Sequence, residues 1–264
     1  MPLKFCANIS WLFNEKENLI DRYKAAKEAG FKAVEIGYPN LYKVPIEDLV
    51  KSSSEAGIQH ILINNYPGNQ PDDLGTASIP NRTEDFKKDL EIGIKYAKAL
   101  NCPRLHVLAG RRPNQWGDVA MCEVFLENIK YAADRLQQEG LTLLIEPINP
   151  RVVAGYYLDS PDRALEIMKK VNKPNVKLQL DIFHLQTLVG DLTENIKALL
   201  PYSDHVQIAQ APGRNEVDFE GEVNYKYILK LLEELGYDGW IGLEYKPTGS
   251  TTDSLKWMKK WGYA

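Results

Sequence analysis

A four-residue junction recurs four times in the sequence, each time between an amphipathic segment and an apolar one. The copies are Glu28-Ala29-Gly30-Phe31, Glu55-Ala56-Gly57-Ile58, Gln138-Glu139-Gly140-Leu141 and Glu234-Leu235-Gly236-Tyr237. A glycine just past the last turn of a helix readily adopts the left-handed backbone conformation that ends the helix. The junctions therefore predict a chain in which helices alternate with strands.

The same alternation extends over the whole chain. Apolar runs of strand length occupy residues 3–9, 33–37, 58–63, 104–108, 141–146, 176–182, 205–209 and 240–245. Helical patterns follow them at residues 17–29, 45–56, 83–100, 118–136, 160–171, 191–200, 223–235 and 252–261. Eight such units in 264 residues are typical of a (β/α)8 barrel, and the glycine-rich phosphate loop common in open doubly wound sheets does not occur in the sequence. We predict an α/β protein built as a single (β/α)8 TIM barrel, one domain over residues 1–264.

Composition excludes several classes of function. The formal net charge is −4 and no Lys/Arg run stands out, which argues against a nucleic-acid partner. No apolar run approaches membrane-spanning length, and residues 1–13 lack the pattern of a signal peptide. Cys6, Cys102 and Cys122 are widely spaced, which favours buried thiols in a reducing compartment. We expect a cytoplasmic protein that binds a small molecule and no membrane; the sequence leaves oligomeric state open, a homo-oligomer included.

Oxygen-bearing side chains stand at the carboxyl ends of the last four expected strands: Glu146, Asp181, Gln207 and Glu244. The long segments 64–82, 109–117, 147–159 and 210–222 also follow strands, and this is the end at which barrels keep their active sites. A single strand-end acid more often caps a helix or pairs with a basic residue. Four on consecutive strands favour a metal site, and three carboxylates with one amide oxygen suit Mg²⁺ or Mn²⁺.

Other polar residues lie close to the same end. We predict that His184, just past the sixth strand, and Arg111, Arg214 and Lys246, on strand-to-helix loops, bind the substrate and its carboxylate. Taken one at a time, each basic residue is as well explained by a solvated surface charge. The remaining histidines, His60, His106 and His205, fall inside strands and are expected to be core or supporting groups. Aromatic residues on the same loops are expected to cover the barrel rim; they are Trp11, Phe13, Tyr66 and Trp116.

Six segments resemble the hydroxypyruvate isomerase family. They are Phe5-Cys6-Ala7-Asn8-Ile9-Ser10-Trp11-Leu12-Phe13, Leu143-Leu144-Ile145-Glu146-Pro147-Ile148-Asn149, Gln179-Leu180-Asp181-Ile182-Phe183-His184, His205-Val206-Gln207-Ile208-Ala209, Gly221-Glu222-Val223-Asn224-Tyr225 and Gly242-Leu243-Glu244-Tyr245-Lys246-Pro247. That family belongs to the xylose-isomerase-like barrels. The resemblance implies a divalent metal, Mg²⁺ or Mn²⁺, at Glu146, Asp181, Gln207 and Glu244, with Glu146 and Glu244 as the acid/base pair. The implied reaction interconverts hydroxypyruvate and tartronate semialdehyde (2-hydroxy-3-oxopropanoate), three-carbon hydroxy-oxo acids, through an enediolate.

Three alternatives stay open at this point. A sugar 3-epimerase would use the same acids and metal, although similar epimerases typically carry histidine at the position of Gln207. The segment 214–221 also departs from the Gly/Pro-rich form common in the resembled family. A nuclease similar to endonuclease IV would need more histidine and aspartate ligands and a basic rim, against which the net charge of −4 argues. A non-catalytic binding barrel could retain the same residues without turnover.

Overall fold

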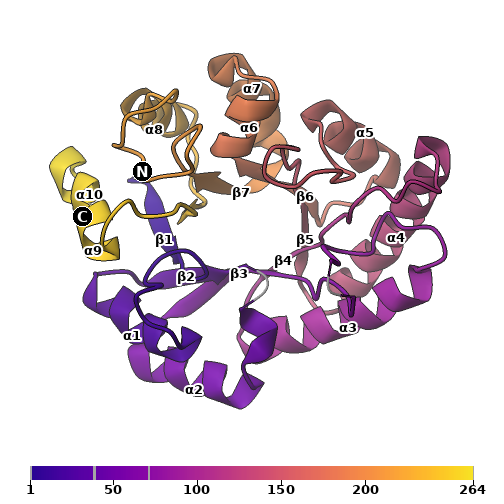
Figure 1. The fold of residues 1–264 in the computed structure, drawn as a ribbon, viewed down its shortest axis with the longest axis horizontal. Helices are drawn as coiled ribbons and strands as arrows, with labels where there is room; N and C mark the ends of the chain where they lie inside the picture. The colour runs from indigo at the N-terminus through magenta and orange to yellow at the C-terminus, as the bar shows by residue number, and fades with distance from the viewer. Residues whose placement is uncertain (1, 38–39, 71, 264) are drawn as a thin grey trace. The chain divides into compact units, whose positions relative to one another are not determined.

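Eight parallel strands follow one another in sequence order around a closed barrel in residues 2–37, 40–70 and 72–263, which the computed structural model describes (Figure 1). They are β1 (Lys4–Asn8), β2 (Ala33–Ile36), β3 (Gln59–Asn64), β4 (Arg104–His106), β5 (Thr142–Ile145), β6 (Val176–Asp181), β7 (Ser203–Ile208) and β8 (Trp240–Leu243). The predicted (β/α)8 TIM-barrel fold is therefore confirmed.

Helices separate the strands. The α-helices are α1 (Leu19–Glu28), α2 (Ile46–Ala56), α3 (Thr83–Ala99), α4 (Asp118–Gln138), α5 (Pro161–Val171), α6 (Ile182–Leu188), α7 (Leu192–Leu199), α8 (Tyr225–Glu234), α9 (Thr251–Ser254) and α10 (Lys256–Trp261). Two short 3-10 helices, η1 (Leu41–Lys43) and η2 (Leu200–Tyr202), complete the elements in the described part of the chain. None of the helices described is long and apolar enough to cross a lipid bilayer.

The chain divides into two compact units, and the boundaries fall within β3 and β6. Residues 1–61 and 180–264 form the first unit, and residues 62–179 form the second. The first unit buries Trp257, whose ring meets Phe5 edge-on with centroids 5.6 Å apart. The second buries Phe125, which meets Tyr157 edge-on at 5.4 Å. In Figure 1, α1 lies beside α2 in the first unit and α3 beside α4 in the second.

Strand register in the first unit fixes which side chains share a level. Asn8 on β1 pairs with Glu35 on β2, and Cys6 pairs with Gly242 on β8. Gly242 pairs in turn with Gln207 on β7. Because side chains alternate between the two faces of a strand, Cys6 and Asn8 lie on one face of β1, and His205 and Gln207 lie on one face of β7.

The four glycine junctions end helices as predicted. Gly30, Gly57, Gly140 and Gly236 have φ values of 94°, 63°, 71° and 74°. Ser160 caps α5, since its side chain accepts a hydrogen bond from the backbone N–H of Arg163.

Two sequence predictions of secondary structure need correction. Apolar periodicity predicts a sixth strand that reaches residue 182, but β6 ends at Asp181 and helix α6 begins at Ile182. The Asp181 side chain caps α6 by accepting backbone hydrogen bonds, an interaction that apolar periodicity does not reveal. The helix expected at residues 252–261 is divided into α9 and α10.

Candidate active site

Asp181 ends β6, and its two carboxylate oxygens have different partners. Oδ1 accepts hydrogen bonds from the backbone N–H groups of Phe183 at 2.7 Å and His184 at 3.4 Å. Oδ2 accepts from Nη2 of Arg214 at 3.2 Å. The carboxylate therefore has two roles. It caps helix α6, as a strand-end acid often does, and it also pairs with the positively charged guanidinium of Arg214.

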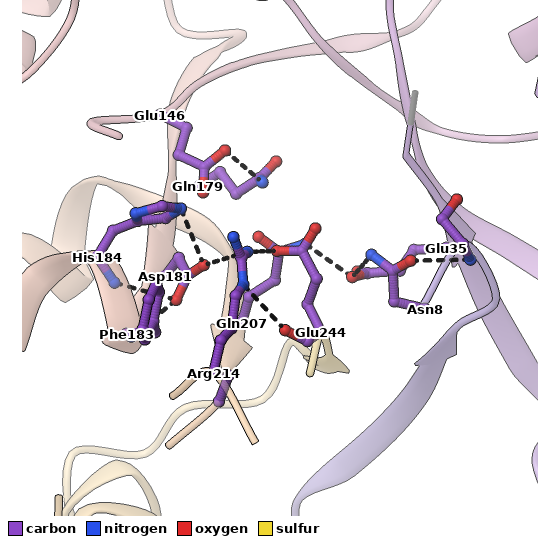
Figure 2. Close-up of polar contacts among 12 residues, drawn as sticks. Asn8, Glu35, Glu146, Gln179, Asp181, Phe183, His184, Gln207, Arg214 and Glu244 are labelled. Carbon is purple, nitrogen blue, oxygen red and sulfur yellow. Dashed lines mark hydrogen bonds and ion pairs between the residues drawn. The ribbon is translucent and has the colours of Figure 1, made fainter. Parts of the chain in front are cut away.

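Arg214 joins Asp181 to Glu244. Its Nη2 lies 2.6 Å from Glu244 Oε2, and its Nε donates to the Glu244 carbonyl oxygen at 3.3 Å. The guanidinium also lies over the rings of Trp11, at 4.8 Å, and Phe183, at 5.0 Å. Figure 2 shows Arg214 between the two carboxylates. Aromatic faces and carboxylates together hold the guanidinium in one position.

Glu244 follows β8 directly and is largely removed from solvent, with a side chain 14% exposed. Burial raises the pKa of Glu244 to about 8; Asp181 and Glu35 add to the increase, whereas Arg214 opposes it. The cause is the cost of holding a negative charge away from water near other carboxylates. Ionised Glu244 therefore depends on a nearby positive charge.

Gln207 lies on β7 and is buried. Its Nε2 donates to Oε1 of Glu35 at 2.7 Å, and the same oxygen accepts from Nδ2 of Asn8 at 2.9 Å (Figure 2). His205, two residues earlier on β7, contacts the other oxygen of Glu35 through its Nε2. The expectation that His205 is a supporting group agrees with this contact.

Glu146 belongs to the second unit and is buried at the end of β5. Its Oε2 accepts a hydrogen bond from Nε2 of Gln179 at 3.0 Å (Figure 2). Nδ1 of His106 lies 3.6 Å from the same oxygen. Pro147 follows, so the strand ends where the carboxylate is presented.

His184 is buried on α6, with Nε2 3.5 Å from Asp181 Oδ2. Burial lowers the pKa of His184 to about 4; Asp181 opposes this effect and Arg214 reinforces it. The imidazole is therefore neutral at pH 7. A neutral ring can donate one hydrogen bond and accept another, which suits contact with a polar substrate.

The other predicted substrate-binding residues lie in different surroundings. Arg111 is exposed and its Nη1 donates to the Ala154 carbonyl oxygen at 3.0 Å. Lys246 is also exposed, although its backbone N–H donates to the Arg214 carbonyl oxygen at 2.7 Å. Among these basic residues, Arg214 has its guanidinium against the predicted ligands Asp181 and Glu244.

The first unit contains oxygen ligands that suit a divalent cation. Asp181 Oδ2 and Glu244 Oε2 already face one positively charged nitrogen, so their carboxylates converge on a point where positive charge is favourable. Gln207 stands on the strand between β6 and β8. Carboxylate and amide oxygens are the ligands that Mg²⁺ and Mn²⁺ prefer.

Sequence reasoning missed Glu35 and Asn8. Glu35 interrupts an otherwise apolar strand, Ala33-Val34-Glu35-Ile36, and is 1% exposed. A charged residue on a fully buried strand is rare unless it is paired. The glutamate at position 35 could therefore have been recognised from the sequence as a candidate functional residue.

Fold and site together define a barrel enzyme of the xylose isomerase-like class: a family model described as xylose isomerase-like TIM barrel matches residues 23–261. A Danio rerio protein named as a candidate hydroxypyruvate isomerase is 47% identical over 266 residues, covering 98% of this chain and 96% of the relative. The 2-oxo-tetronate isomerase of Pectobacterium atrosepticum is 39% identical over 262 residues, covering 99% and 98%. The chain belongs to the hydroxypyruvate isomerase family.

Among solved structures, one from Brucella melitensis described as an AP endonuclease of family 2 is 39% identical. It superposes with a TM-score of 0.93 and covers 98% of this chain and 99% of its own.

Proposed function

We propose that this isomerase interconverts hydroxypyruvate and tartronate semialdehyde. The observation that carries the proposal is the convergence of buried Asp181 and partly buried Glu244 on one positive charge, at the carboxyl ends of β6 and β8. The similarity to candidate hydroxypyruvate isomerases over nearly the whole chain supports the choice of substrate.

The reaction moves a carbonyl group by one carbon. A proton leaves C3 of hydroxypyruvate and electrons shift to form an enediolate. A proton is then added at C2, and the hydroxyl proton of the C3 oxygen passes to the C2 oxygen. We assign the two proton transfers to Glu146 and Glu244. Burial raises the pKa of Glu244 above that of an exposed carboxyl group, toward the range in which a general acid–base residue exchanges a proton near neutral pH.

Glu146, Asp181, Gln207 and Glu244 would hold a divalent cation, Mg²⁺ or Mn²⁺. Such an ion supplies positive charge that stabilises a negatively charged enediolate more than it stabilises the bound substrate. Asp181 keeps its orientation because Oδ1 is held by the backbone of α6. We propose that Glu146 and Glu244 act on the same substrate molecule, within one catalytic domain.

Arg214 is the residue we assign to the substrate carboxylate. Its guanidinium is planar, and the rings of Trp11 and Phe183 restrict its movement. Neutral His184 is assigned to a hydrogen bond with a substrate oxygen. Lys246 and Arg111 are exposed and would act at the entrance of the site. None of the three cysteines forms a disulfide in the described residues, which is consistent with a cytoplasmic location.

A four-carbon substrate is the second candidate, because the relative from Pectobacterium atrosepticum is a 2-oxo-tetronate isomerase. Hydroxypyruvate and 2-oxo-tetronate share a carbonyl at C2 and a hydroxyl at C3, so one site chemistry serves both. A sugar 3-epimerase would also use two acids and a metal, but its substrate has no carboxylate for Arg214.

The proposal is tested by proton exchange in D₂O. Purified protein with Mn²⁺ or Mg²⁺ is incubated with hydroxypyruvate, and NMR follows deuterium at C3 together with formation of tartronate semialdehyde. Parallel reactions contain 2-oxo-tetronate, a panel of ketoses, and DNA with an abasic site. Exchange and product from hydroxypyruvate support the assignment, whereas exchange confined to ketoses or cleavage confined to DNA would replace it. If the protein binds metal but neither exchanges deuterium into a substrate nor forms product, it would be a non-catalytic binding barrel.

A further inference from the structure

Glu35 is a buried carboxylate on β2 that is surrounded by hydrogen-bond donors. Oε1 accepts from Asn8 at 2.9 Å and from Gln207 at 2.7 Å. Oε2 contacts Nε2 of His205, and the Cys6 thiol lies 3.7 Å from it. The thiol and the imidazole both point at one oxygen, so this cluster is built as a hydrogen-bond network around Glu35.

The orientation of the Asn8 amide is fixed independently of Glu35. Its Oδ1 accepts a hydrogen bond from the backbone N–H of Ser10 at 3.1 Å, and a backbone N–H can only donate. Asn8 must therefore present its NH₂ group to Glu35. Oε1 of Glu35 consequently acts as an acceptor, whatever the protonation of Oε2.

This acceptor decides the orientation of Gln207. When Oε1 carries no proton, an oxygen that already accepts from Asn8 pairs with Gln207 through the Gln207 NH₂ group. The opposite rotamer of the amide would bring two acceptor oxygens together. With Nε2 committed to Glu35, Oε1 of Gln207 is left on the other side of the amide.

Gly242 makes this contact sterically feasible. Gln207 on β7 pairs with Gly242 on β8, and Gly242 pairs with Cys6 on β1. A Cβ atom at position 242 would lie 2.3 Å from Oε2 of Glu35. Because Gly242 has no side chain, the Glu35 carboxylate occupies the space that a side chain at position 242 of β8 would fill. From there the carboxylate, which comes from β2, contacts Gln207 on β7.

We propose that Glu35 is a positioning residue that orients the Gln207 amide so that its carbonyl oxygen, and not its NH₂ group, is presented to the divalent cation. The inference rests on the proposed metal site. A cation binds the amide oxygen and is repelled by the NH₂ group, so the orientation of one amide controls one ligand.

The test measures Mn²⁺ affinity by electron paramagnetic resonance for the wild type, Glu35→Met, Glu35→Gln, Gln207→Ala and the double variant Glu35→Met/Gln207→Ala. Glu35→Met removes the acceptor at similar volume and should weaken binding by about 10- to 100-fold, the usual effect of losing a group that orients a metal ligand. Glu35→Gln keeps an acceptor oxygen for Asn8 and Gln207 and should retain most of the affinity. In the Gln207→Ala background, Glu35→Met should change affinity by less than about threefold, because its effect passes through Gln207.

Equal losses from Glu35→Met with and without Gln207 would overturn the positioning role, as would unchanged affinity in Glu35→Met. Failure of the wild type to bind Mn²⁺ would instead overturn the proposed metal site, and the positioning role with it.

A second pair of variants is isosteric and applies even if Glu35→Met does not fold. Gln207→Glu adds a negative ligand and would ordinarily strengthen cation binding, but here the new carboxylate faces Oε1 of Glu35, and two adjacent carboxylates repel each other unless they share a proton. We expect Gln207→Glu to lower the melting temperature and to gain no Mn²⁺ affinity. Glu35→Gln in the same chain removes one of the two facing charges and should restore part of the melting temperature. An unaltered melting temperature with tighter Mn²⁺ binding in Gln207→Glu alone would contradict the proposal.

Discussion

Nη2 of Arg214 lies 2.6 Å from Oε2 of Glu244 and 3.2 Å from Oδ2 of Asp181. One guanidinium thus balances two carboxylates that are mostly withdrawn from water. A buried carboxylate left without such a partner is costly, so this arrangement couples the charge of Arg214 to the state of both acids.

We predict that Arg214→Met raises KM for hydroxypyruvate by about 10- to 100-fold, because a hydrogen bond to a charged group contributes about 1.5–3 kcal/mol. Mn²⁺ affinity should not decrease, since loss of the guanidinium leaves the carboxylates more attractive to a cation. Steady-state kinetics and Mn²⁺ titration check the two effects separately. Arg151→Met, at an exposed arginine, is the control. An unchanged KM would remove Arg214 from substrate binding.

Replacing either proposed acid/base residue should reduce turnover without unfolding the protein. Glu146→Gln and Glu244→Gln each preserve side-chain shape and should lower kcat by about 10²- to 10⁴-fold, the usual contribution of general acid–base catalysis. Circular dichroism verifies the fold of each variant, and Glu47→Gln at an exposed position of α2 serves as the control. Near-normal kcat in one variant would exclude that residue from proton transfer.

Removing divalent metal should abolish isomerisation. After dialysis against a chelator, we expect activity to return with Mg²⁺ or Mn²⁺, because oxygen ligands bind hard cations. The measurement is product formation against added metal, with the metal content of each sample determined by mass spectrometry. Full activity in a preparation shown to be metal-free would refute the mechanism.

Asp89 on α3 provides a test of stability against pH. Burial raises its pKa to about 6, an effect that the hydrogen bond from Thr76 opposes, and the side chain is almost fully enclosed. The unfolded chain ionises Asp89 near its ordinary value of 3.8, so the protonated form stabilises the fold at low pH. This contribution is lost as pH rises from about 4 through 6.

Asp89→Asn should consequently stabilise the protein at pH 7 by on the order of 2 kcal/mol, since one pKa unit corresponds to about 1.4 kcal/mol. The difference from wild type should vanish near pH 4. Urea unfolding at several pH values measures it, and Asp238→Asn at an exposed site is the control. A difference that does not vary with pH would show that Asp89 is not the titrating group.

Local sequence determined the order of elements in this protein. Strand and helix periodicities, with glycines 30, 57, 140 and 236 at helix ends, depend on residues close together in the chain, and they were sufficient to predict the barrel. The same logic located Asp181 and Glu244 at strand ends. Periodicity did not predict helix α6, because its start depends on a side-chain cap from Asp181.

Tertiary structure alone decided which side chains meet. Glu35 and Gln207 are 172 positions apart, and their hydrogen bond exists because barrel closure places β8 against β1 and Gly242 leaves room for the carboxylate. Arg214 was one of several basic loop residues in the sequence, and only the course of the 210–222 loop directs it onto Asp181 and Glu244. Periodicity reports which face of an element is buried, whereas the partner of a buried charge is set by packing between distant segments.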